Sequence, residues 1–288
     1  MMELIVNGAK TYCYTGGKAF DAAKPTVVFI HGVLNDHSVW ILQSRYLANH
    51  GWNVLAVDLP GHCRSAGEAP ETVEQAAGFI AALLDAAKVP RAALVGHSWG
   101  SLIALEAAAR LKDRISHLVL VGTAFPMKVS QALLDASLNE PMKALTMINV
   151  FSRSTLAAPP SVLGPGTWVY GAGMALGRRV LASNRKVNLF HRGFKACDSY
   201  ANGDNAVAQI NCPVLFLLGA QDQMTMPKAA QGLIAKAREA GKSVQVVKLP
   251  VGHHQMSETP DETLFAIRDS WPAEAQTGTA GRRCRSTQ

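Results

Sequence analysis

The sequence lacks the features of membrane-spanning and exported proteins. No uncharged apolar window reaches the roughly 18 to 20 residues that a membrane helix needs. The opening stretch MMELIVNGAKTY carries Glu3 and has neither the basic start nor the long apolar run of a signal peptide. These absences predict a cytoplasmic protein without membrane insertion.

The cysteines also lack a pattern. They are odd in number and show no CxxC or other metal-binding spacing. They are Cys13, Cys63, Cys197, Cys212 and Cys284. We expect free thiols in a reducing compartment, and no metal or cofactor is predicted.

Basic residues are not organised for nucleic acid. The net charge of +7 comes partly from the end GRRCRSTQ, which follows the weakly hydrophobic stretch PAEAQTGTA. Residues 272–288 are therefore predicted to form a disordered basic tail. No basic face with a recognisable binding module occurs, so no nucleic-acid partner is expected.

The chain does contain apolar runs that alternate with helical stretches. Helical spacing covers residues 38–50, 72–88, 99–111, 227–240 and 260–271. The apolar runs are PTVVFIHG, WNVLAVDLP, RAALVGHS, ISHLVLVG, PVLFLLG and SVQVVKLP. Continuous apolar runs predict strands buried on both faces, and hence a parallel sheet. The fold class is therefore α/β, with a mostly parallel, doubly wound sheet and an antiparallel hairpin over residues 4–6 and 11–15 at its edge.

The alternation stops between residues 125 and 205. Gly, Pro, Met and aromatic residues mix there with helical stretches, and no buried-strand run occurs. We predict a first part of the α/β core over 1–124, a helical lid over 125–205 and a second part of the core over 206–271.

The segment RAALVGHSWGSLIALEAAAR carries the strongest chemical signal. A buried strand runs into Gly96-His97-Ser98-Trp99-Gly100, and a helix follows. A serine on such a sharp turn needs small residues two places away on either side, because the backbone is crowded there. Its hydroxyl then stands clear at the carboxyl edge of the sheet, above a helix N-terminus that favours negative charge. The pattern predicts that Ser98 is a nucleophile, with a purely structural turn as the alternative.

A serine nucleophile needs a base and an acid that orients the base. Asp222 lies in the loop after PVLFLLG, and His253 and His254 follow SVQVVKLP. The order Ser, Asp, His is the one that this kind of sheet uses. Adjacent side chains point in different directions, so one of the two histidines is expected to act. Taken alone, Asp222 would be interpreted as a solvated or helix-capping residue, but its position relative to Ser98 and the two histidines favours the role of orienting acid.

An oxyanion needs two hydrogen-bond donors. The natural ones are the backbone N–H groups of Trp99, after the nucleophile, and Val33, after a strand that ends in His31-Gly32. We expect His31 to be structural, and the same holds for His37 and His97.

These motifs resemble those of the α/β-hydrolase superfamily, in its lid-bearing branch of serine esterases, cofactor-free haloperoxidases and C–C bond hydrolases. The resemblance covers residues 26–271 apart from the insertion, and includes DLPGHCRS at 58–65. Family members often end in Gly-His, four residues, Glu, one residue and Pro. Here Gly252-His253 is followed in that register by Glu258 and Pro260, so the resemblance implies that His253 is the base. Cys63 stands where the family often has glycine, and we expect a buried structural thiol.

The resemblance implies a serine hydrolase that cleaves a carboxylic ester, or a related acyl bond, of a small apolar substrate through an acyl-enzyme. Relatives that dehalogenate alkanes or open epoxides use an aspartate nucleophile, so Ser98 argues against both reactions. Perhydrolase or haloperoxidase, C–C hydrolase, lactonase and amidase activities remain alternatives, as does a non-catalytic ligand-binding member of the fold.

The insertion is rich in basic residues. A solvated basic face is the expected interpretation, with recognition of a carboxylate-bearing substrate as the alternative. The residues are Arg153, Arg178, Arg179, Arg185, Lys186, His191, Arg192 and Lys195.

Overall fold

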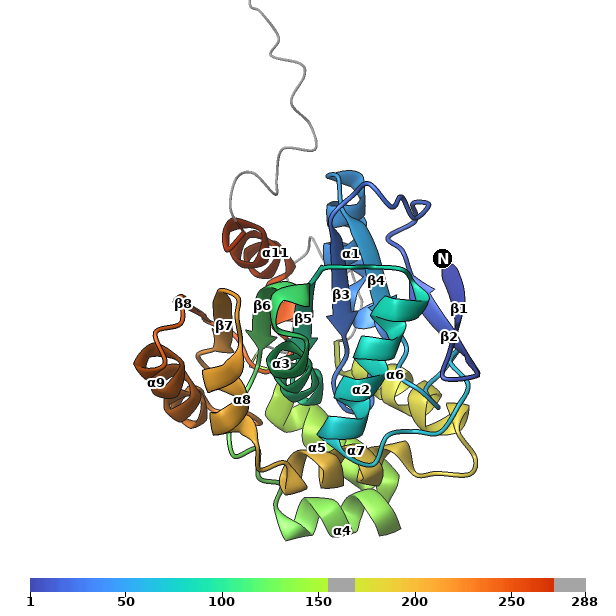
Figure 1. The fold of residues 1–288 in the computed structure, drawn as a ribbon. Helices are drawn as coiled ribbons and strands as arrows, with labels where there is room; N and C mark the ends of the chain where they lie inside the picture. Colours follow the sequence, from blue (N-terminus) through green and yellow to red (C-terminus); the bar gives the residue numbers. More distant parts are fainter. Residues whose placement is uncertain (155–168, 272–288) are drawn as a thin grey trace, which may run out of the picture.

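The computed structural model describes residues 1–154 and 169–271, and the strands in these ranges form one eight-stranded sheet in the order β1-β2-β4-β3-β5-β6-β7-β8 (Figure 1). The strands are β1 (Met2–Val6), β2 (Ala9–Tyr14), β3 (Thr26–Ile30), β4 (Asn53–Val57), β5 (Ala92–His97), β6 (Ile115–Val121), β7 (Val214–Gly219) and β8 (Val244–Leu249). Strands β3 to β8 pair in parallel, and the β1–β2 hairpin joins β4 in antiparallel fashion. The predicted fold class is confirmed, including the hairpin at the edge.

Helices fill the connections between strands. Those of the core are α1 (Ile41–Asn49), α2 (Val73–Ala86), α3 (Trp99–Leu111), α9 (Gln231–Glu239), α10 (Gln255–Glu258) and α11 (Pro260–Asp269). Short 3-10 turns are η1 (His37–Trp40), η2 (Lys112–Arg114) and η3 (Pro227–Ala230). Between β6 and β7 lie α4 (Gln131–Asn139), α5 (Pro141–Ser152), α6 (Val169–Ser183), α7 (Leu189–Ser199) and α8 (Gly203–Gln209). None of the described helices is long and apolar enough to cross a bilayer.

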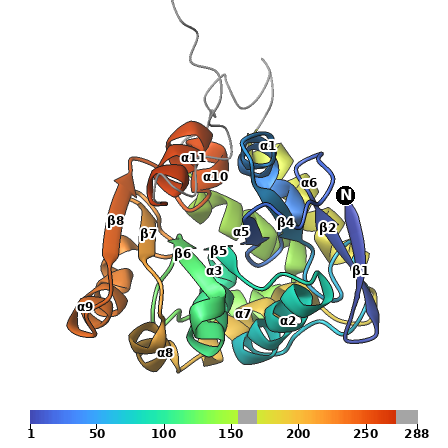
Figure 2. The same cartoon turned by 45° about the horizontal axis from the view of Figure 1, so that its top comes forward.

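The two faces of the sheet pack into separate apolar cores. Successive side chains of a strand point to opposite faces, so Val28 and Ile30 join α2 and α3 while Val27 and Phe29 join α1 and α11 (Figure 2). Burying each such side chain contributes roughly 1.5–3 kcal/mol. This two-sided burial explains why the central strands read as continuous apolar runs.

Strand β8 differs from that expectation. Its residues are mostly half-buried or exposed, because β8 is the last strand of the sheet and pairs only with β7. The prediction that SVQVVKLP is buried on both faces was therefore wrong. The prediction of a disordered tail over residues 272–288, with Cys284, lies outside the described residues.

The insertion helices α4 to α7 lie beyond the carboxyl ends of the parallel strands (Figure 1). They share a small apolar core of their own, which includes Leu145, Val180, Phe190 and Phe194. This core also takes in Leu34, from the loop after β3, so the insertion packs on the body of the protein.

A buried carboxylate holds the end of the insertion against α3. Glu106 of α3 accepts hydrogen bonds from the Tyr200 hydroxyl at 2.8 Å and the Asn202 amide at 2.9 Å, and it pairs with Arg110 at 2.7 Å. Helix α8 packs here through Ala206 and Val207. The boundary that we drew at residue 205 falls inside this helix.

The buried carboxylate of Glu106 should contribute more to the free energy of unfolding than an exposed ion pair does. Glu106→Gln should lower the free energy of unfolding by about 1–3 kcal/mol, because the buried donors lose a charged partner. Glu3→Gln, which breaks the exposed pair with Lys10, should change it by less than about 0.5 kcal/mol. Urea titration of both variants measures the difference, and equal effects would contradict this account.

Candidate active site

Ser98 lies on the tight turn between β5 and α3. Its φ of 54° and ψ of −121° place a non-glycine residue in a strained region of backbone conformation. The neighbouring glycines explain how the turn fits, because a Cβ on Gly96 would overlap the Gly100 carbonyl oxygen and one on Gly100 would overlap that of Ile30. The serine itself is partly exposed. The structure thus has the backbone that the GHSWG pattern predicts.

The two predicted oxyanion donors come from adjacent elements. Trp99 is the first residue of α3, so its N–H has no acceptor within the helix. Val33 follows Gly32, and a Cβ on Gly32 would be 3.1 Å from Ser98 Cβ. The loop after β3 therefore lies directly against the serine. Strand β3 has β4 on one side and β5 on the other, which is the switch point where ligands bind in such sheets.

Asp222 and His253 meet at the same edge of the sheet. Asp222 Oδ2 lies 2.8 Å from His253 Nδ1, and both side chains are almost fully buried. Asp222 Oδ1 accepts the N–H groups of Met224 and Thr225, each at 2.8 Å. The side chain thus ties its own loop and the imidazole together.

Thr225 is a third member of this group, and sequence reasoning missed it. Its Oγ1 lies 2.7 Å from Asp222 Oδ2, 3.0 Å from His253 Nδ1 and 2.9 Å from the Gly122 carbonyl oxygen. The available signal was local, because an aspartate often accepts backbone N–H groups two and three residues onward.

The pKa of Asp222 lies below its ordinary value. Burial raises this pKa, but the adjacent His253 ring and the hydrogen bonds from Thr225 outweigh the effect. The carboxylate therefore stays ionised at neutral pH. An ionised carboxylate at Nδ1 favours the tautomer in which Nδ1 carries the proton and Nε2 is open as an acceptor.

The backbone of His253 is fixed from two sides. Its N–H donates to the Ser152 carbonyl oxygen at 2.6 Å, and its carbonyl oxygen lies 2.8 Å from His97 Nε2. Ser152 is the last residue of α5, so the insertion contacts the histidine loop directly.

Glu258 gives the Gly-His register its physical basis. Its carboxylate accepts the N–H groups of Gly252 and His254, each at 3.3 Å, and the N–H and hydroxyl of Ser154 at 3.0 and 2.7 Å. A glutamate at this spacing therefore closes the loop around His253.

His254 faces a different environment from His253. The two rings are nearly perpendicular, at 80°, with centroids 5.9 Å apart. Burial, with added repulsion from Arg153, holds the pKa of His254 well below its ordinary value, so this ring is neutral. Only His253 of the doublet contacts Asp222 within the described chain. Ser98 Oγ has no hydrogen-bond partner there either, so contact between Ser98 and His253 remains a prediction.

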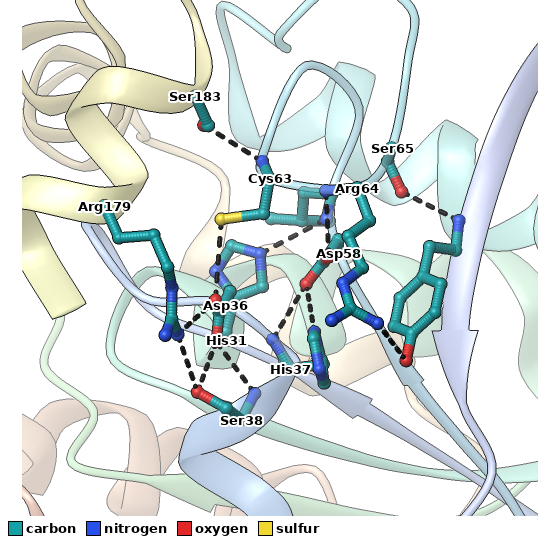
Figure 3. A network of polar contacts seen from close by, with 12 residues as sticks. His31, Asp36, His37, Ser38, Asp58, Cys63, Arg64, Ser65, Arg179 and Ser183 are labelled. Atoms are coloured by element: carbon teal, nitrogen blue, oxygen red, sulfur yellow. Dashed lines mark hydrogen bonds and ion pairs between the residues drawn. The ribbon is translucent and has the colours of Figure 1, made fainter. Parts of the chain in front are cut away.

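The other singled-out histidines bind backbone or carboxylate groups. His31 Nδ1 lies 2.9 Å from the Gly32 carbonyl oxygen, and its Nε2 accepts the Leu59 N–H at 3.2 Å. His37 Nδ1 lies 2.7 Å from Asp58 Oδ1 (Figure 3). These contacts support the structural roles that we expected.

Figure 3 shows a polar network that joins α6 to the loops after β3 and β4. Arg179 of α6 pairs with Asp36 at 2.7 Å, and Ser183 accepts the Cys63 N–H at 3.0 Å. Cys63 has a φ of 46°, which explains why glycine suits this position. Its sulfur lies 3.5 Å from Asp36, and burial raises the pKa of the thiol to about 12, so it stays protonated.

One group in the described chain has the donor types of a metal site. Donor atoms of Asp36, His37 and Asp58 lie within 4.8 Å of one another. These donors already serve each other and Arg179 (Figure 3). We therefore describe the group as a hydrogen-bond network.

A cavity of about 370 Å³ lies between the core and the insertion. Its lining includes Val33 and His254, whereas Ser98 and His253 do not line it. Most of the lining is apolar, and it comes from the loop after β3, from α1 and from insertion helices α5 and α6. The cavity is thus next to the predicted chemistry.

Comparison with known proteins establishes the family. Residues 25–260 match the family described as alpha/beta hydrolase fold. The chain belongs to the α/β-hydrolase family.

Individual relatives differ in their reactions. An epoxide hydrolase of Caballeronia sordidicola is 36% identical over 122 residues, which cover 40% of this chain and 37% of that protein. A protein of Pantoea ananatis named as a carbamate hydrolase, RutD, is 26% identical over 258 residues, or 87% of this chain and 89% of that one. The chain spans only 28 to 44% of the length of three curated relatives that are 34 to 37% identical to it.

Solved structures agree on the fold. An enol-lactonase from Burkholderia xenovorans LB400 has a TM-score of 0.75, with 93% of this chain and 99% of that chain covered. Its 23% identity supports the α/β-hydrolase fold and nothing finer.

Burial of His97 should make stability depend on pH. Burial, assisted by His253, lowers the pKa of His97 to about 3. Below pH 6.5 the His97 imidazole binds a proton in the unfolded chain but not in the folded protein, so the free energy of unfolding falls as the pH falls. His97→Gln should remove this component. When the pH falls from neutral to about 5, the free energy of unfolding should therefore fall less in the variant than in the wild type. The difference between the two falls should be up to about 2 kcal/mol.

Urea titrations at several pH values test this prediction. His50→Gln is the control, because it removes an exposed imidazole and should leave the pH dependence as in the wild type. Parallel pH profiles for wild type and His97→Gln would refute the assignment.

Proposed function

We propose that this protein is a serine hydrolase that cleaves a carboxylic ester, or a related acyl bond, of a small apolar substrate. The observation that carries the proposal is the 2.8 Å contact between Asp222 and His253 at the sheet edge where Ser98 occupies its strained turn. Base and orienting acid are thus in the relation that activates a serine.

The proposed reaction runs in two halves. His253 Nε2 takes the proton of Ser98 Oγ as the oxygen attacks the substrate carbonyl, and the N–H groups of Val33 and Trp99 bind the oxyanion. His253 then protonates the leaving group. Water, activated by the same imidazole, hydrolyses the acyl-enzyme. Asp222 stays ionised throughout and stabilises the imidazolium.

The cavity supports a small and largely apolar substrate. Its volume of about 370 Å³ is at the lower end of ordinary ligand pockets. Insertion helices α5 and α6 form one wall, so we propose that the insertion acts as a lid that selects substrates.

The nucleophile limits the reaction class. The family's epoxide-opening members use an aspartate where this chain has Ser98, so we propose acyl transfer despite the similarity to an epoxide hydrolase. Lactones, carbamates, peracid formation and ring-cleavage diketones belong in the substrate panel beside p-nitrophenyl esters, because the same three residues would serve each reaction.

Ser98→Ala should lower kcat/KM for the best p-nitrophenyl ester by at least about a thousandfold, because the nucleophile is lost. A fluorophosphonate probe should label the wild type and not this variant. Normal ester turnover by Ser98→Ala, or labelling elsewhere in the chain, would sink the proposal. Tight ligand binding without labelling would favour a non-catalytic role.

The histidine doublet supplies a matched pair of variants. His253→Gln should lose at least about a thousandfold in kcat, because the general base is gone. His254→Gln should stay within about tenfold, since its neutral ring lines the cavity without contacting Asp222. Steady-state kinetics of both variants decide the assignment, and the reverse ranking would make His254 the base.

A further inference from the structure

The cavity between core and insertion contains a cation, Arg153, that has no anionic partner among residues 1–154 and 169–271. Arg153 and Arg179 of the insertion both line it. Arg179 pairs with Asp36 at 2.7 Å and also donates to Ser38. Arg153 has no ion pair or hydrogen bond within residues 1–154 and 169–271, and its Nε is buried with no acceptor.

Glu258 forms no ion pair or hydrogen bond with Arg153 within the described residues. Glu258 is close enough to act electrostatically on the guanidinium, but its oxygens accept from the backbone of Gly252 and His254 and from Ser154. Burial lowers the pKa of Arg153, yet a guanidinium stays charged in proteins. The cavity therefore holds a half-buried positive charge, and its N–H groups have no hydrogen-bond acceptor in the described parts of the chain.

Such a charge is costly unless a ligand satisfies it. Removing a guanidinium from water without a partner destabilises the protein, whereas a carboxylate can accept two of its N–H groups at once. The rest of the ligand should be apolar, because the cavity has apolar walls formed by Val33, Leu145, Ile148 and Leu176. An apolar chain that ends in an anionic oxygen group fits both features.

We propose that Arg153 is a substrate-binding residue that selects esters whose apolar segment ends in a carboxylate. This inference rests on the proposed esterase function, and it names the substrate class. Val33 connects the cavity to the proposed reaction centre, because it lines the cavity while its N–H is the proposed oxyanion donor. The carboxylate lies at the Arg153 end of the cavity, and the scissile carbonyl lies at the Val33 end.

The kinetic test compares substrates that differ in one charge. Mono-p-nitrophenyl esters of straight-chain dicarboxylic acids are paired with p-nitrophenyl esters of fatty acids of equal chain length. The readout is the ratio of kcat/KM for the anionic ester to that for the neutral ester. Arg153→Met should lower this ratio roughly tenfold to a hundredfold, as the loss of charge-assisted hydrogen bonds implies. Arg153→Lys should retain part of the preference, because it keeps the charge and loses the planar fork.

Arg178→Met is the matched control. Arg178 is exposed on α6, carries the same charge and does not line the cavity, so its loss should leave the ratio unchanged. If Arg153→Met and Arg178→Met lowered the ratio equally, the preference for the anionic ester would come from the overall surface charge of the protein. That result would overturn the proposal. An unchanged ratio in Arg153→Met would do the same.

A binding measurement separates this inference from the proposed chemistry. Calorimetry on the Ser98→Ala protein needs no turnover. A medium-chain alkanoate should bind, the matching alkanol should bind at least roughly tenfold more weakly, and Arg153→Met should abolish the difference. If the alkanoate binds in this way while Ser98→Ala keeps full ester turnover, the site stands and the proposed function fails. Equal binding of alkanoate and alkanol would refute the site while leaving the hydrolase proposal intact.

Discussion

The first turn of α3 lies directly against the carbonyl oxygens of Ile30 and His31 at the end of β3. This contact leaves no room for a side chain on Gly100, and the same crowding excludes one on Gly96. The chain passes from β5 to α3 through the strained conformation of Ser98. The position of Ser98, the free N–H of Trp99 and the approach of the Gly32-Val33 loop all follow from this packing.

The second half of the site depends on hydrogen bonds to loops. Asp222 holds the His253 ring, while His97 and Ser152 hold its backbone from the core and from the insertion. The last residue of α5, Ser152, is thus in direct contact with the proposed base. Arg153 is the next residue, so the proposed substrate-binding residue and the contact with the His253 backbone lie at the same end of one helix.

Local sequence patterns predicted most of the sheet and the elbow, because strand burial and the GHSWG spacing are consequences of nearby residues. The Gly-His register to Glu258 also has a local basis, since Glu258 accepts hydrogen bonds from the backbone of its own loop. Contacts between distant segments were not predictable in this way. Arg179 and Asp36, 143 residues apart, meet only because the insertion folds back over the loop after β3.

Some features of the site and the sheet could be identified only from the three-dimensional structure. Thr225 carries no motif of its own, and its role depends on where β6, β7 and the histidine loop converge. The exposure of β8 depends on its being the last strand, which its composition does not reveal. The sequence showed many basic residues in the insertion, but the structure was needed to find that Arg179 pairs with Asp36 and that Arg153 has no such partner among the residues it describes.

The central claim is that Ser98, His253 and Asp222 act as one unit beneath the Val33 and Trp99 amides. A crystal structure of the phosphonylated protein tests it most directly. We predict a covalent bond from Ser98 Oγ to phosphorus, with the phosphoryl oxygen about 2.7–3.1 Å from both amide nitrogens and His253 Nε2 within hydrogen-bond distance of Ser98 Oγ or the leaving-group oxygen. An adduct on another residue, or a phosphoryl oxygen that contacts neither amide, would contradict the account.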